Sequence, residues 1–203
     1  MAVILMVKLI LERTLQMGHS QAQKAENRAR ILALAAAHIR AHGIESLTVA
    51  ALMEAAGLTH GGFYGHFSSR EALVAAAIET AMDDGAAGAA RAKGDSLHEI
   101  ARGYLSQRHR DAPDSGCAIA AIGGETARFS DDSRAMMATH IDAFIAGVRP
   151  FVADDDHAAM TVSALVGALM IARIYPDKQD SDVFRKAVQR GIATLAPLTP
   201  SSE

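Results

Sequence analysis

A short polar segment carries the side chains best suited to recognising a partner by hydrogen bonding. Between the apolar residues Leu58, Phe63 and Phe67 stand hydroxyl, imidazole, phenol and glycine positions: Thr59, His60, Gly61, Gly62, Tyr64 and His66. On a short helix whose apolar side faces a core, these positions share the opposite face. Such a face can bond base edges and phosphates of DNA, and the paired glycines allow close approach of a DNA backbone or a thymine methyl. The alternative is a poorly formed helix that tertiary contacts hold, since each glycine costs a helix about 1 kcal/mol relative to alanine.

The elements around this segment predict a helix-turn-helix. A first helix is expected at about Gln21–His42. Thr48 is a good N-cap for a two-turn helix that Gly57 ends, and Thr59 can cap a second short helix that runs through Phe67. A tight turn at Gly57 sets these two helices across each other, so that the second can enter a major groove while the first braces it.

The rest of the chain predicts further helices and no sheet. Ser68 and Glu71 form the S-x-x-E pattern of a capping box, which starts a long helix. More helices are expected at about 96–110, 117–128, 131–152, 154–175 and 181–195, with a turn at 112–116. Abundant alanine favours helices that pack closely. The sequence therefore predicts an all-α fold of roughly nine helices.

Composition narrows the class of protein. The chain has 203 residues and a net charge of −3, but residues 17–70 carry five Lys and Arg against three Asp and Glu. A mildly positive N-terminal part is typical of anion binding. The single cysteine, Cys117, rules out an internal disulfide and fits a reducing cytoplasm. No apolar run is expected to be long enough to span a bilayer, so no membrane partner is predicted.

Residues 1–16 look superficially like a signal segment. They lack its basic start and its small-residue cleavage site, and Lys8 interrupts the apolar run. We expect residues 1–16 to be a non-native or flexible extension. The alternative is a short native helix that packs on the body.

One stretch resembles a known family. The run Ala55-Ala-Gly-Leu-Thr-His-Gly-Gly-Phe-Tyr-Gly-His-Phe-Ser-Ser-Arg-Glu-Ala-Leu73 closely resembles the N-terminal domain of the TetR/AcrR family, and Phe-Tyr-x-His-Phe is its most specific part. The resemblance implies a three-helix helix-turn-helix DNA-binding domain at 17–68 and a larger helical ligand-binding and dimerisation domain at 69–203. It also implies a homodimeric transcriptional regulator, usually a repressor that a small-molecule effector releases from a palindromic operator. No catalytic residue, cofactor or metal is expected.

The resemblance also assigns DNA contacts by position. Thr48 would hydrogen-bond a phosphate, and Arg70, where the family usually has lysine, would supply a phosphate-binding cation. The residues that would touch base edges are Thr59, His60 and Gly61, with Gly62 on the same face. Those that would contact the backbone are Tyr64 and His66.

Cys117 suggests a different means of sensing. It follows Gly116 at an expected helix start, where the positive end of the helix dipole favours a thiolate. It resembles family members in which a Gly-Cys at this place senses electrophiles or oxidants, so a thiol-based sensing repressor is one alternative function. A buried, inert cysteine is the simpler interpretation. A further alternative is an all-α small-molecule-binding protein that does not bind DNA and would not need the polar face described above.

Two groups of residues in the C-terminal part are predicted to bind ligand and partner. Methionine-rich interiors adapt to varied ligands, and the residues expected to line an effector pocket are His109, Cys117, Met137, His140, Phe144 and Met160. Small residues allow two helices to approach closely, and the resemblance places the dimer interface at Ser163, Ala164, Gly167 and Ala168.

Overall fold

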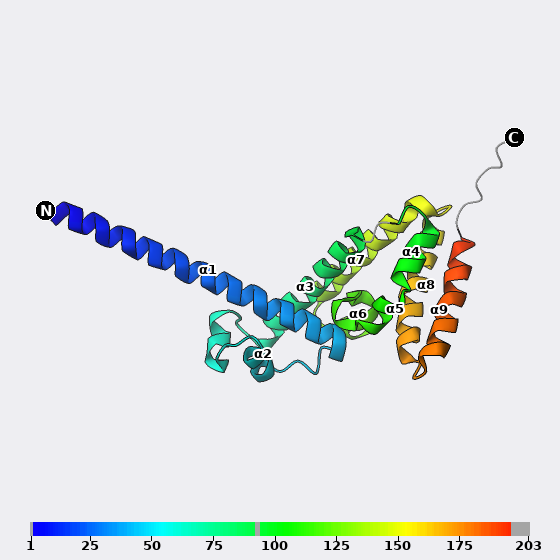
Figure 1. Cartoon of the computed structure of the whole chain (residues 1–203), viewed down its shortest axis with the longest axis horizontal. Helices are drawn as coiled ribbons and strands as arrows, with labels where there is room; N and C mark the ends of the chain where they lie inside the picture. The colour runs from blue at the N-terminus through cyan, green and yellow to red at the C-terminus, as the bar shows by residue number, and fades with distance from the viewer. Residues whose placement is uncertain (1, 92–93, 196–203) are drawn as a thin grey trace.

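The structure, a computed structural model, describes the backbone of residues 2–91 and 94–195 and the side chains of residues 21–85 and 94–195. In that part of the chain every regular element is a helix (Figure 1). The elements are α1 (Ala2–His42), α2 (Val49–Ala55), η1 (His60–Gly65), α3 (Arg70–Arg91), α4 (Leu97–Tyr104), α5 (Gln107–Asp111), η2 (Pro113–Ser115), α6 (Ala118–Thr126), α7 (Asp131–Val148), η3 (Arg149–Phe151), α8 (Asp155–Ile174) and α9 (Lys178–Ala193). The predicted all-α fold is confirmed.

Local sequence signals start and stop these helices. Gly43, at φ +85°, ends α1, and Gly57, at φ +68°, makes the turn between α2 and η1. Both angles lie in the left-handed region that glycine adopts at little cost. Side-chain oxygens cap the first turns of α4, α5, α7, α8 and α9, and the capping residues are Ser96, Ser106, Ser130, Asp154 and Asp177.

The buried apolar residues form two clusters that share α6 and α7. The first joins α1, α2, η1 and α3, and it includes Ile122 of α6 and Met137 of α7. The second joins α4, α8 and α9, and it includes Ala120 of α6 and Val148 of α7. Because α6 packs into both clusters, it lies between the N-terminal helices and the C-terminal ones (Figure 1).

A buried arginine joins α1 to η2 and α3. Arg40 in α1 is only 6% exposed. Its guanidinium donates to the carbonyl oxygens of Asp114 (2.6 Å) and Ala81 (3.1 Å) and to the carboxylate of Asp84 (3.2 Å). A buried charge is tolerated only when it is well bonded, so these contacts fix α1 against η2 and α3.

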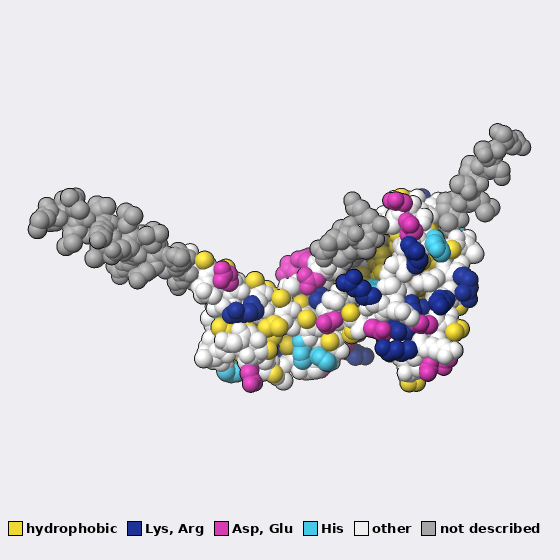
Figure 2. All heavy atoms as spheres, viewed as in Figure 1, with side chains coloured by type: hydrophobic (Ala, Val, Ile, Leu, Met, Phe, Trp, Pro, Cys, Tyr) yellow, Lys and Arg dark blue, Asp and Glu magenta, His cyan; other side chains and the backbone are white. Residues whose placement is uncertain are grey.

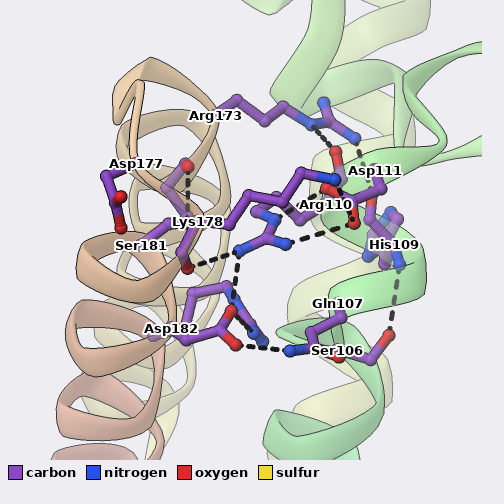
Figure 3. Close-up of polar contacts among 12 residues, drawn as sticks. Ser106, Gln107, His109, Arg110, Asp111, Arg173, Asp177, Lys178, Ser181 and Asp182 are labelled. Atoms are coloured by element: carbon purple, nitrogen blue, oxygen red, sulfur yellow. Dashed lines mark hydrogen bonds and ion pairs between the residues drawn. The ribbon is translucent and has the colours of Figure 1, made fainter.

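A second polar network fastens α9 to the helices beside it (Figure 3). The carboxylate of Asp182 accepts from Arg110 of α5 at 2.7 Å, from Gln107 and from Arg185. The hydrogen bond from Arg185 is the largest cause that lowers the pKa of Asp182 to about 2. The carboxylate therefore stays ionised at neutral pH, and the network is present there.

The structure differs from the predicted elements in several places. Thr48 and Thr59 stand at the expected helix starts but make no side-chain capping bond, and the helix expected at 131–152 is divided into α7 and η3. The residue that caps α3 is Ser69, whose hydroxyl accepts from the amide of Ala72 (3.2 Å), and not Ser68. The helix expected at 96–110 is divided into α4 and α5, because Ser106 caps a new first turn by accepting from the amide of His109. The second helix of the predicted helix-turn-helix is the 3₁₀ helix η1, and the first helix begins at Ala2.

The prediction that no apolar run could span a membrane was wrong for α8. By length and composition alone, this helix could cross one. One side of α8 is nevertheless occupied by the second apolar cluster, to which it contributes Ala158, Val162, Leu165, Ala168 and Leu169. The core helix of a compact domain has the same composition, so the membrane interpretation gains little support from it.

Candidate functional site

The polar face predicted from the sequence lies on the surface of the N-terminal part. Thr59, His60 and Gly61 are exposed, Tyr64 is 71% exposed, and Gly62 and His66 are half-buried. Thr48 is exposed at the start of α2, where its side chain makes no capping bond. All of these side chains lie on or beside the α2–η1 unit.

Aromatic packing holds η1 in place although three of its six residues are glycine. Phe63 is 2% exposed, and its ring stacks on that of Phe67 with centroids 5.7 Å apart. A Cβ at Gly61 or Gly65 would meet nothing within 4 Å, so these glycines leave space on the outer side. The segment therefore matches the alternative interpretation, an imperfect helix held by tertiary contacts, and its outer surface is open to a partner.

Arg70 is bound to backbone on the inner side of this unit. Its Nε donates to the carbonyl oxygen of Leu47 and its Nη2 to that of Ile44, both at 3.2 Å. These carbonyls lie in the corner between α1 and α2. Arg70 therefore positions the α1–α2 corner, a role that the sequence did not suggest.

Sequence reasoning missed a contribution from α1 to the same surface. Gln23, Lys24 and Asn27 line a surface hollow of about 380 Å³ together with Gly65 and His66. Burial lowers the pKa of His66 below its usual 6.5, and the positive charges of Lys24 and Arg28 lower it further. The spacing of four residues between Gln23 and Asn27 and between Lys24 and Arg28 is the signal that could have found this face.

Charge is distributed unevenly over the molecule. On the face shown in Figure 2, Lys and Arg side chains gather mainly at the end formed by α4, α5 and α9, and a smaller group lies at the helix-turn-helix end.

Among the described residues, no group of three or more His, Cys, Asp or Glu side chains is placed to hold a metal ion.

A second site centres on Cys117, which is half-buried at the N-cap of α6. The amide of Cys117 donates to Nε2 of His109 at 2.9 Å, and Nδ1 of His109 lies 2.6 Å from the carbonyl oxygen of Tyr104. One ring nitrogen must therefore accept while the other donates, so His109 is neutral with its proton on Nδ1. Burial lowers the pKa of His109 below 6.5, in agreement with this geometry, and the charge of Arg173 also lowers it.

Tyr104 completes this site. Its hydroxyl oxygen is buried beside the Cys117 side chain and, among the described residues, has no hydrogen-bond partner of good geometry; its ring contacts His109 and Phe144 at centroid distances of 4.8 and 5.5 Å. Burial, followed by the nearby Cys117, raises the pKa of Tyr104 well above 10.0, so the hydroxyl remains a donor. A buried donor without a partner can bond a ligand oxygen or a thiolate.

The backbone before Cys117 is tightly enclosed. A Cβ at Gly116 would lie 2.9 Å from Cδ2 of His109 and 3.0 Å from Nη2 of Arg173. Arg173 in turn donates from Nη2 to the carbonyl oxygen of His109 (2.9 Å) and from Nε to that of Arg110 (3.3 Å). Only glycine fits at this position without movement of its neighbours.

The structure brings together half of the residues predicted to bind an effector. Cys117, His109 and Phe144 surround Tyr104, a residue that no sequence pattern singled out. Met137 lies elsewhere, in the first apolar cluster, and Nε2 of His140 lies 3.8 Å from a carboxylate oxygen of Asp83. Met160 is 59% exposed on α8, outside this group.

The residues predicted at a dimer interface divide between surface and core. Ser163 is exposed and Gly167 half-buried, whereas Ala168 is 4% exposed and packs inside. On α8 the exposed residues that share one stripe with Ser163 and Gly167, at spacings of three and four, are Met160, Met170, Ile171 and Ile174. Ile174 is 78% exposed and Val183 of α9 is 63% exposed. Of this stripe, the sequence analysis placed the small residues Ser163 and Gly167 at an interface, assigned Met160 to the effector pocket, and did not place the other large residues at the interface.

Comparison with known proteins identifies the fold. The family model described as bacterial regulatory proteins, tetR family, matches residues 31–77. Most of the chain is similar in structure to TetR-family regulators from Cytophaga hutchinsonii (TM-score 0.72, 20% identity, 87% of this chain and 98% of that one) and Chloroflexus aurantiacus (TM-score 0.71, 23% identity, 86% and 98%). The chain has the TetR-family fold. The predicted resemblance is confirmed.

A third similar structure is that of Escherichia coli NemR in its reduced form, with a TM-score of 0.68, 20% identity, and coverage of 87% of this chain and 100% of that one. No curated protein matches the chain in sequence. The helix-turn-helix of the TetR-family fold corresponds here to α2 and η1, which fall within residues 31–77.

The contacts of His109 lead to a prediction about pH. Protonation of Nε2 would remove the acceptor for the Cys117 amide, and the unfolded chain takes up this proton near pH 6.5. The folded pKa is the lower one, so the stability from this bond is complete above 6.5 and is lost as the pH falls through the folded pKa. In NMR titrations, the His109 ring should titrate below 6.5, and the Cys117 amide shift should follow the same midpoint.

His109→Gln is the matched control for this titration. Its side-chain amide can donate to Tyr104 and accept from Cys117 without titrating. The melting temperature of this variant should therefore depend less on pH below 6.5 than that of the wild type. Equal pH dependence in both proteins, or a Cys117 amide that ignores the ring titration, would contradict the neutral bridging role of His109.

Proposed function

We propose that this protein is a non-enzymatic, cytoplasmic transcriptional regulator that binds a palindromic operator as a homodimer. We further propose that it is a repressor and that a small-molecule effector releases it. The observation that carries the proposal is the exposed polar face of η1, which lies within the segment that matches the family model, beside Lys24 and Arg28 of α1. Thr48, Thr59, His60, Gly61, Gly62, Tyr64 and His66 are the DNA-binding residues of this proposal.

The chemistry of this face divides into two tasks. The hydroxyl of Tyr64 and the cations of α1 suit phosphate oxygens, which position the protein but carry no sequence information. His60 and Thr59 suit base edges, which specify the sequence. Two copies can read one duplex when their η1 segments are about 34–36 Å apart, one helical turn of DNA. An effector that favours another separation would release the DNA.

Three substitutions on this face test DNA binding. Tyr64→Ala should weaken binding to an enriched operator and to a scrambled duplex alike. His60→Ala should cost about 1–3 kcal/mol on the operator and much less on the scrambled duplex. Lys24→Ala should reduce the salt dependence of binding by about one counterion. Fluorescence anisotropy over a range of salt concentrations measures all three effects.

His98→Ala and Lys186→Ala are the matched controls, since both residues are exposed on α4 and α9, far along the chain from η1. They should bind like the wild type. If His60→Ala and Tyr64→Ala also bind both duplexes like the wild type, η1 does not face the DNA.

The exposed stripe of α8 supports the homodimer. Met160, Met170, Ile171 and Ile174 would remain in water in a single chain, and Gly167 interrupts them with a site of close approach. Large exposed apolar patches mark interaction surfaces. A second copy that packs the same stripe against this one would bury both, as in an isologous interface.

Gly167→Leu tests this interface. Among the described residues of the chain, a Cβ at Gly167 meets nothing within 4 Å, so the first atom of a side chain there causes no clash within the single chain. In sedimentation experiments the variant should be a monomer at concentrations where the wild type is a dimer, and its operator affinity should fall. Gly103→Leu on α4, where a Cβ also meets nothing within 4 Å, should remain dimeric. A dimeric Gly167→Leu protein would place the interface elsewhere.

The cluster around Cys117 supports a second candidate, a regulator that senses electrophiles or oxidants. A thiol that adds to a quinone forms a C–S bond and leaves its proton on the product, and the buried Tyr104 hydroxyl is placed to donate to an oxygen anion. If no covalent chemistry occurs, Tyr104, His109, Cys117 and Phe144 would bind a reversible effector instead.

Cys117→Ser distinguishes the two candidates. Benzoquinone should release operator DNA from the wild type and leave the serine variant bound, and mass spectrometry should find the adduct on Cys117 at the dose that releases DNA. The serine variant should bind untreated operator like the wild type. Release that persists in Cys117→Ser would exclude thiol sensing and favour the reversible effector.

A further inference from the structure

The segment from η2 to the end of α6 is tied to the end of α1 at two points. At its start, the carbonyl oxygen of Asp114 accepts from Arg40 at 2.6 Å. At its end, Oε2 of Glu125 accepts from the backbone amide of Ile44 at 2.7 Å. Arg40 lies in the last turn of α1, and Ile44 follows the end of this helix by two residues. The segment that contains Cys117 is therefore held on both sides by the end of α1 and the backbone just beyond it.

The hydrogen bond that Ile44 donates to Glu125 replaces one that the end of a helix usually makes to its own backbone. Gly43, in the left-handed region, donates to the carbonyl oxygen of Ile39 at 2.9 Å. The next amide, that of Ile44, would usually return to a carbonyl of the same helix, but here it donates to Glu125. A Cβ at Gly43 would lie 2.9 Å from Oε1 of Glu125, so glycine also leaves room for this carboxylate.

Ile44 opens the corner from which α2 and then η1 follow. Its amide is held by α6 and its carbonyl oxygen by Arg70 of α3. A movement of Glu125 would therefore displace the α1–α2 corner directly, in addition to any movement that α3 transmits to it. Glu125 does not lie on the proposed DNA-binding face, so its effect on DNA would pass through the corner.

The opposite end of α6 begins at Cys117, whose amide is bound to His109 and whose preceding Gly116 is enclosed by His109 and Arg173. Between these ends α6 is a nine-residue helix with Ala118, Ala120 and Ile122 buried. A well-packed short helix moves as a unit, so displacement at its first residue reaches its last turn.

We propose that Glu125 is a positioning residue that couples the Gly116–Cys117 junction to the α1–α2 corner, with α6 as the rigid connection. The part of this inference that concerns DNA rests on the proposed function. The coupling itself concerns only the chain. The conformation of the Gly116–Cys117 junction thus determines the position of the α1–α2 corner and of η1 after it, whether an effector binds covalently or reversibly.

A double-mutant cycle tests the coupling without knowledge of the effector. Gly116→Ala forces the junction to move, because its Cβ would clash with His109 and Arg173. Glu125→Ala removes the acceptor for Ile44. We expect Gly116→Ala to change operator affinity by about fivefold or more in the Glu125 background and by less than about twofold in the Glu125→Ala background. Glu125→Gln, which keeps an acceptor oxygen, should retain most of the effect.

Gly124→Ala is the matched control, since it lies on the same helix and its Cβ meets nothing within 4 Å. It should leave affinity unchanged in both backgrounds. If Gly116→Ala does not fold, His109→Ala takes its place, because it removes the acceptor for the Cys117 amide at the same junction. Equal fold-changes with and without Glu125 would overturn the proposal.

Amide hydrogen exchange without DNA separates this proposal from the proposed function. Perturbing the junction should alter exchange at residues 44–47 when Glu125 is present and leave it unchanged in Glu125→Ala. This result would stand even if no duplex bound the protein. Exchange at residues 44–47 that responds equally in both backgrounds would exclude the coupling, whatever the DNA affinity.

Discussion

The arrangement of α1, α3 and η2 depends on one buried guanidinium. Arg40 leaves water and is compensated by bonds to two other elements: to η2 through the carbonyl oxygen of Asp114, and to α3 through the carbonyl oxygen of Ala81 and the carboxylate of Asp84. Breaking such a set leaves an unpaired buried charge, which costs about 3–5 kcal/mol, so α1, η2 and α3 keep their relative positions. The α2–η1 unit follows α1 in sequence, and the Cys117 junction follows η2. The positions of both candidate sites, the α2–η1 face and the Cys117 junction, therefore depend on the contacts of Arg40.

The sequence predicted well what depends on local pattern. Helical spacing, N-capping residues and the glycines at 43 and 57 gave most helices to within a few residues, and the resemblance in the segment 55–73 gave the fold. Residues of the proposed DNA face could be named because they alternate with Phe63 and Phe67, which pack inward. The capping residue of α3 was displaced by one position because Ser68 and Ser69 are chemically equivalent, and only the backbone path selects between them.

What could not be predicted depends on contacts between residues distant in the chain. Nothing local to Tyr104 indicates that its hydroxyl is buried beside Cys117, and nothing local to Glu125 indicates that it bonds Ile44, 81 residues away. Arg70 matches a family position for a phosphate-binding cation, yet two of its donors are used by the α1–α2 corner. In each case the sequence shows the residue type, but the packing of whole helices determines which residue it contacts.

The central claim is that the face formed by η1 and α1 recognises a particular DNA sequence as part of a symmetric dimer. Selection from a pool of random duplexes by the purified full chain, followed by sequencing of the retained fraction, tests it most directly. The account predicts enrichment of an inverted repeat whose half-sites are about one helical turn apart, 10–10.5 base pairs from centre to centre. Retention of duplexes without any common sequence, or no retention at low salt, would contradict it.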